Sequence, residues 1–116
     1  MQTYDLTERM FRFARDIRCL VNSLPKKTTN FEDGRQVVRS SGSVGANYIE
    51  ASEPLGFKDE LHKLKISRKE VKETIYWLKL IMSQNNIELL TDISKLIDEA
   101  TQILKILSTI IKKLQD

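Results

Sequence analysis

Cysteine and histidine are almost absent from this 116-residue chain, which contains one of each. A single cysteine cannot form an internal disulfide, and one cysteine with one histidine cannot make a structural zinc site. Cys19 falls in an apolar pattern of helical spacing, so we expect a packed or half-exposed small side chain in a reducing compartment. The sequence therefore predicts no metal site, and no motif in it indicates a cofactor.

Long hydrophobic runs are also missing, because no stretch approaches eighteen apolar residues. The first residues, MQTYDLTERMFRFARD, lack the basic start, apolar run and small-residue cleavage site of a signal peptide. We therefore expect a soluble, cytoplasmic protein with no membrane partner. The net charge is +3, from 19 basic and 16 acidic residues, which permits an anionic partner without requiring one.

What the chain does have is apolar residues at helical spacing. The pattern predicts helices over residues 6–24, 31–52, 57–83 and 87–114, joined by short breaks at Pro25, at Pro54 with Gly56, and at the QNN segment. No alternation of period two is long enough for a sheet. We expect an all-α fold, an antiparallel up-down-up-down four-helix bundle that occupies residues 1–116 as one domain.

The segment 31–52 has helical spacing but poor helix propensity. Gly34, Gly42 and Gly45 lie in it among several serines, and each interior glycine destabilises a helix by about 1 kcal/mol relative to alanine. Small side chains let another backbone approach closely, so tertiary contacts are expected to hold this helix. Asn30 is available to cap it. A flexible Ser/Gly loop is the alternative interpretation.

The last predicted helix carries a wider apolar face than a two-helix contact needs. Beside its main apolar row lies a second row at intervals of seven, made of Leu90, Ile97, Leu104 and Ile111. Together with the small side chains of residues 31–52, this face is more contact surface than one bundle readily covers. We therefore expect copies of the chain to associate.

Catalytic motifs are incomplete. The SSGSVG stretch has no following lysine, so it is not a phosphate-binding loop, and the Ser-x-x-Lys match at Ser23 spans a helix end. A di-iron bundle site needs paired Glu-x-x-His motifs, whereas His62 is the sole histidine and is expected on a helix surface. We predict that the protein is not an enzyme.

Polar residues fall at inward positions of the second and third predicted helices: Arg39, Asn47, Glu50, Arg68 and Glu73. Arg68 occupies the apolar seam of the helix 57–83, where a buried charge needs a partner. We expect a structural polar network that fixes helix register or subunit contacts. A ligand or small-molecule catalytic site built on Arg39, Glu50 and Arg68 is the alternative.

Lysines recur once per heptad along the helix 57–83, namely Lys58, Lys65, Lys72 and Lys79, and Lys69 extends the patch. Lysine stems commonly cover apolar surface while their charged ends stay in water. The alternative is a track of ammonium groups about 10 Å apart that binds phosphates without reading sequence. Trp77 beside Tyr76 fits packing at a helix or subunit border, with base stacking as its alternative.

The middle of the chain resembles a known family. The run RSSGSVGANYIEAS, then a short turn and FKDELHKLKISRKEVKETIYWLKLI, is similar to the four helix bundle protein family, also called the 23S ribosomal RNA intervening-sequence proteins. The matching positions are Arg39, Ala46, Asn47, Glu50, Lys58, Asp59, Glu73, Tyr76, Trp77 and Leu78. The chain departs from the family pattern in two ways: Ala51 replaces the usual glycine, and the segment SEPLG replaces a basic turn.

The resemblance implies a four-helix protomer assembled as a ring, commonly a homopentamer, with no known catalytic activity. The chain also looks similar to the accessory variability protein of diversity-generating retroelements, a pentameric basic barrel that binds nucleic acid and a reverse transcriptase. Five copies at +3 each would carry about +15, and multivalency strengthens weak contacts. We expect a homo-oligomer that binds RNA or DNA electrostatically through the five lysines. The alternative is a scaffold for another protein with no nucleic-acid role.

Overall fold

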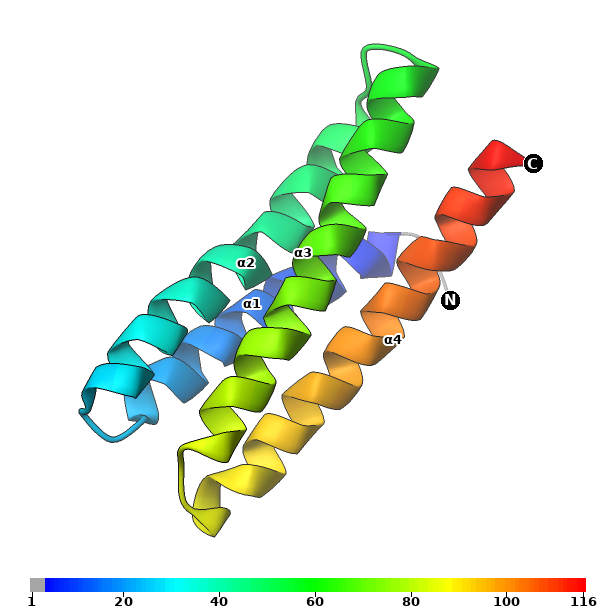
Figure 1. The fold of residues 1–116 in the computed structure, drawn as a ribbon. Coiled ribbons are helices and arrows are strands. Elements are labelled where there is room, and N and C mark those ends of the chain that lie inside the picture. The colour runs from blue at the N-terminus through cyan, green and yellow to red at the C-terminus, as the bar shows by residue number, and fades with distance from the viewer. Residues whose placement is uncertain (1–3) are drawn as a thin grey trace.

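The chain forms four long helices in the computed structural model, which describes residues 4–116. They are α1 (Tyr4–Ser23), α2 (Thr28–Ser52), α3 (Phe57–Ser83) and α4 (Leu90–Gln115), with the short 3-10 helix η1 (Ile87–Leu89) before α4. Each long helix runs antiparallel to the one before it (Figure 1). The predicted all-α, up-down-up-down bundle is confirmed.

The helix boundaries differ from the prediction most at the starts of α2 and α4, and α4 begins at Leu90 because residues 87–89 form η1. Helix α2 begins at Thr28, three residues earlier than expected, and the residue that precedes it, Lys27, makes no side-chain cap hydrogen bond. Asn30 therefore lies inside the helix, where its buried amide group donates to the Pro25 carbonyl oxygen at 2.8 Å. The helix continues unbroken to Ser52, so the alternative of a flexible Ser/Gly loop is wrong.

The small side chains of α2 allow close packing on two sides. Toward α1, Gly34 lies so near Val21 that an added Cβ would meet the valine Cγ1 at 2.9 Å. Toward α3, Ser67 donates a hydrogen bond to the Val44 carbonyl oxygen at 2.7 Å, and the hydroxyls of Ser40 and Thr74 lie 2.8 Å apart. Tertiary contacts thus compensate for the poor helix propensity of this segment.

A pair of glycine substitutions tests this packing. At Gly45 a new Cβ would meet Met10 at an ordinary 3.5 Å, so Gly45→Ala should gain helix propensity, up to about 1 kcal/mol. Gly34→Ala has the same propensity gain but must displace Val21, whose branched side chain is stiff. We expect its free energy of unfolding to be lower than that of Gly45→Ala by about 1 kcal/mol or more in urea denaturation. Equal values would contradict the close α1–α2 packing.

The core runs along the bundle axis and is built from all four helices. Its largest fully buried side chains are Phe13, Met10, Ile17, Leu78, Ile81, Ile93, Ile103, Leu107, Ile111, Val37, Val44 and Val71. The second apolar row of α4 is only partly covered, because Ile111 is buried while Leu90, Ile97 and Leu104 are half-buried. One copy of the chain therefore leaves part of that row in contact with water.

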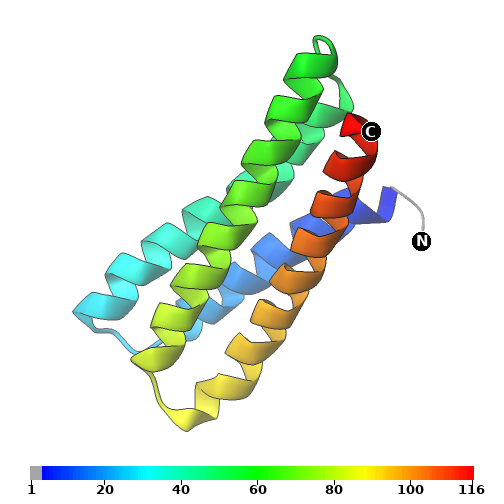
Figure 2. The same cartoon turned by 45° about the vertical axis from the view of Figure 1, so that its right-hand side comes forward.

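Polar contacts tie the helices together at two levels. Near the start of α1, the Arg9 guanidinium donates to both carboxylate oxygens of Glu99 at 2.6 and 2.8 Å and to Gln102. These bonds to Glu99 raise the pKa of Arg9. α4 continues past Gln102 to Gln115, which is roughly three and a half further turns. Figure 2 shows that the end of α4 lies beyond the start of α1 along the bundle.

At the opposite end of the bundle, two connections are joined by side-chain amides. Asn30 and Asn85 exchange reciprocal hydrogen bonds of 2.9 and 2.8 Å, and Lys27 donates to the Gln84 carbonyl oxygen. The connections between α1 and α2 and between α3 and α4 are thereby held side by side. Within residues 4–116, no helix combines the length and apolar character that crossing a membrane requires.

Candidate nucleic-acid interface

The predicted lysine track lies on the outer surface of α3. All five side chains, Lys58, Lys65, Lys69, Lys72 and Lys79, are exposed, and we call them the lysine face. None of them takes part in the ion pairs formed among the residues that the structure describes. Their ammonium groups are therefore available to an anion from outside the chain.

The acidic residues nearest to the lysine face are engaged elsewhere. Arg39 of α2 donates to Glu73 at 3.0 Å and approaches Glu70 at 3.4 Å, which draws both carboxylates toward the α2 side of α3. Asp59 accepts the backbone N–H of Leu55 at 3.1 Å, where it holds the turn before α3. The positive charge of the lysine face is thus not cancelled by ion pairs within α3.

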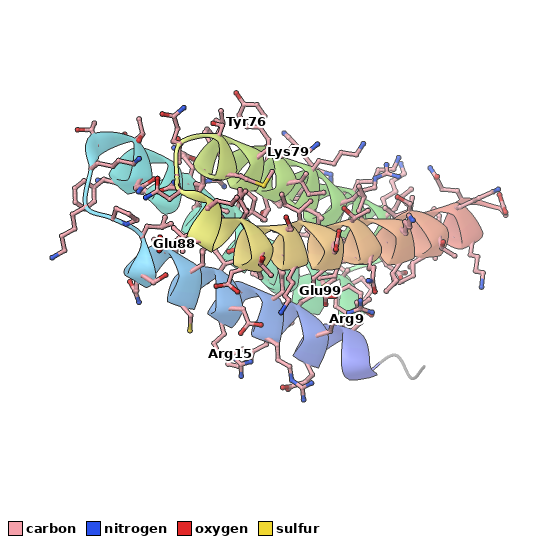
Figure 3. All side chains as sticks on the ribbon, turned by 90° about the horizontal axis from the view of Figure 1, so that it is seen from below. Arg9, Arg15, Tyr76, Lys79, Glu88 and Glu99 are labelled. Atoms are coloured by element: carbon pink, nitrogen blue, oxygen red, sulfur yellow. The ribbon has the colours of Figure 1, made fainter. Side chains whose placement is uncertain are left out.

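An exposed tyrosine interrupts the lysine face. Tyr76 follows Lys72 by four residues and precedes Lys79 by three, so all three lie on one side of the helix. Figure 3 shows Tyr76 and Lys79 projecting from α3, on the far side of the bundle from Arg9 and Glu99. The sequence contains this spacing, although the aromatic residue that it suggested for base stacking was Trp77.

Trp77 itself is half-buried and packs against the core, which agrees with the predicted packing at a helix border. Its ring meets that of Tyr76 edge to face, with centroids 5.1 Å apart and an interplanar angle of 72°. The indole Nε1 is buried and has no hydrogen-bond partner among the described residues. The ring contact with the half-buried Trp77 supports Tyr76 from one side, and the Tyr76 side chain stays 58% exposed.

The five residues of the predicted polar network do not form one network. Arg39 and Glu73 pair, as described above, but Glu50 pairs with Lys63 at 2.7 Å and Asn47 donates to the Ser43 carbonyl oxygen of its own helix. The bond to Glu50 raises the pKa of Lys63. The expected single network is thus replaced by separate local contacts.

Arg68 lies at the edge of the buried face of α3, not on it. It is half-buried and makes no hydrogen bond or ion pair with the described part of the chain. The helix is rotated so that Ser67 and Thr74 face inward, and these small polar groups are satisfied by α2 and by α3 itself. At the edge, the long arginine side chain can place its guanidinium in water, so the charge needs no buried partner.

The alternative catalytic set, Arg39, Glu50 and Arg68, does not line the hollow between α1 and α4. This hollow, of about 300 Å³, is lined by Asp16, Cys19, Leu20, Ser23, Asp92, Lys95 and Leu96. Cys19 is exposed there, although the sequence predicted a packed or half-exposed side chain. His62 is exposed on α3, and the side chains that the structure describes include no cluster of metal-ligating groups.

A second hollow, of about 480 Å³, is an apolar groove between α1 and α2. We call it the α1–α2 groove, and its lining is Thr7, Met10, Phe11, Ala14, Arg15, Arg18, Gly42, Gly45, Ala46 and Ile49. Phe11 and Ile49 are 63% and 55% exposed, so the groove presents two large apolar side chains to water. Figure 3 places α1 and the outer surface of α3 on opposite sides of the bundle, so the groove and the lysine face are separate surfaces.

Together these features define a four-helix bundle protein with a cationic helix surface and a separate apolar groove. The chain belongs to the family described as 23S rRNA-intervening sequence protein, whose model matches residues 2–109. A crystal structure of a protein of unknown function from the S23 ribosomal protein family of Bacteroides thetaiotaomicron is similar, with 32% sequence identity and a TM-score of 0.84. The match covers 97% of this chain and 99% of that one. No curated protein sequence matches the chain.

Proposed function

We propose that this chain is a non-enzymatic, homo-oligomeric protein that binds RNA or DNA through the lysine face without reading sequence. The observation that carries the proposal is the exposure of all five lysines on one helix surface, none of them paired by the described residues. Lysine is a compact point charge on a flexible stem, which suits phosphate contacts better than base recognition. The family description refers to 23S rRNA, which makes RNA a natural probe.

Binding should be tested with labelled nucleic acids of unrelated sequence. Fluorescence anisotropy at low salt should give similar affinities for several duplex DNAs and for a blunt-ended duplex RNA of equal charge, since phosphate contacts carry no sequence information. A dissociation constant that varies more than about tenfold among these sequences would indicate base recognition. No measurable affinity for any of them would end the proposal.

We also propose that copies of the chain associate through the α1–α2 groove. The matching surface is the turn between α2 and α3, where Leu55 and Phe57 are 96% and 54% exposed. Glu53 and Glu60 flank this turn, whereas Arg15 and Arg18 line the groove, so the two surfaces are complementary in charge as well as apolar character. We call residues 53–57 the apolar turn.

The relative position of these surfaces favours a closed ring. Ile49, at one end of the groove, and Leu55 of the turn are six residues apart, which corresponds to about 9 Å along the bundle. A rotation about an axis inclined to the bundle brings the turn of one copy to the groove of the next, a head-to-tail contact that closes into a ring. The number of subunits that the family resemblance favours is five. The lysine face, opposite α1, stays open in such a ring.

The α1–α2 groove also supports the second candidate function, a scaffold for another protein. An apolar contact of this kind should be insensitive to salt, whereas capture of nucleic acid by the lysine face should be lost as salt rises. Pull-down of a partner that survives high salt, combined with no affinity for nucleic acid, would favour the scaffold.

A further inference from the structure

The exposed ring of Tyr76 lies where a base would lie if a strand followed the lysine face. Along α3, Lys69 lies about two helical turns before Tyr76 and Lys72 about one turn before it, and Lys79 lies about one turn after it. A strand held by these ammonium groups passes directly over the tyrosine. Phe11, Phe31 and Phe57 are also exposed, but they lie on α1, near the start of α2 and at the apolar turn.

Contact with Trp77 prepares Tyr76 for stacking. The tryptophan packs against the core and holds the tyrosine ring edge to face at 5.1 Å, which restricts the orientations that the exposed ring adopts. A ring that is already positioned loses less conformational freedom when a ligand stacks on it. The half-buried Trp77 cannot itself present a free face in the same way.

We infer that Tyr76 is a stacking platform for an unpaired base, so that the ligand of the lysine face is a single-stranded segment of RNA or DNA. Bases in a duplex already stack on one another, whereas a single strand can place a base on an aromatic ring whatever its identity. Stacking therefore adds affinity without sequence recognition. This inference rests on the proposed function, because it names the form of nucleic acid that the same surface binds.

The test compares two single strands of equal length and charge, one with normal bases and one made of abasic nucleotides. Fluorescence anisotropy at low salt should show that the normal strand binds about tenfold more tightly than the abasic strand. Tyr76→Ala should remove this difference while leaving the affinity for the abasic strand unchanged. Tyr76→Phe, which keeps the ring, should retain the difference. The emission of Trp77, the sole tryptophan, should change only with the normal strand.

Each other outcome overturns the inference in a recognisable way. Equal affinity of the wild-type protein for both strands would show that phosphate contacts act alone, and the proposed function would survive. If Tyr76→Ala lowered the mass measured by light scattering and left the strand preference intact, the ring would belong to a contact between copies. If neither strand bound at low salt, the proposed function would fail and this inference with it. Because Tyr76 is largely exposed, circular dichroism should show that both variants keep their helices.

Discussion

Reversing three charges of the lysine face, Lys65→Glu, Lys69→Glu and Lys72→Glu together, is expected to weaken binding to duplex DNA by at least about 100-fold in low salt. Each substitution removes an ammonium group that the chain leaves unpaired and places a carboxylate in the path of the phosphates. A duplex is the right probe here, because its bases are not free to stack on Tyr76 and the measurement isolates the electrostatic contacts. Anisotropy titrations of the wild-type and triple variant give the two dissociation constants.

A second triple variant separates the contribution of the lysine face to binding from the contribution of net charge. Lys95→Glu, Lys105→Glu and Lys112→Glu change exposed lysines of α4 and lower the charge of the chain by the same amount. The α4 variant should lose far less affinity than the α3 variant, because the substituted residues belong to a different helix from the lysine face. If both variants lose affinity equally, binding follows total charge and the lysine face has no special role.

Placing an aspartate in the α1–α2 groove, Phe11→Asp, is expected to convert an oligomer into single chains of 13.5 kDa. In the proposed ring the Phe11 side chain is covered by the apolar turn of the next copy, so a carboxylate at this position would have to be buried without a partner. Leu55→Asp on the turn should have the same effect. Both side chains are largely exposed in one copy, so the helical content should not change. Light scattering coupled to size-exclusion chromatography measures the mass.

Mixing the two variants tests whether the contact is head-to-tail. Phe11→Asp keeps an intact apolar turn, and Leu55→Asp keeps an intact groove, so one contact can form between one copy of each. At high protein concentration the mixture should contain a two-chain species of about 27 kDa, twice the mass of one chain, that neither variant forms alone. A wild-type protein that is a single chain at every concentration would contradict the assembly, and single chains in the mixture would contradict the groove and turn as its two halves.

The course of the helices could be predicted because their signals are local. Apolar spacing and the breaks at Pro54 and Gly56 place α3 at the bounds that the structure shows. The start of α2 could not be placed, because the decisive contacts are not local. Asn30, a residue type that commonly caps helices, instead bonds to Asn85, which is 55 positions away in the chain.

Part of the candidate site could likewise be predicted from the sequence, and part of it could not. The heptad spacing of the lysines was enough to place them on one surface of α3, since that follows from the geometry of a helix. Which residues face α2 depends on how α3 is rotated about its own axis against its neighbours. The predicted rotation was wrong by a few tens of degrees, so the sequence placed Arg68 on the buried face, where the structure has Ser67. The pairing of Arg39 with Glu70 as well as Glu73 depends on the same rotation.

The salt dependence of duplex binding tests the central claim most directly, namely that exposed lysines of α3 hold nucleic acid by its phosphates. Each phosphate that a lysine neutralises contributes about −0.9 to the slope of log K against log salt concentration. Engagement of the whole lysine face predicts a slope of about −4 to −5 for each bound chain, with the affinity similar for all sequences. A slope near zero, or binding that persists unchanged at high salt, would contradict the account.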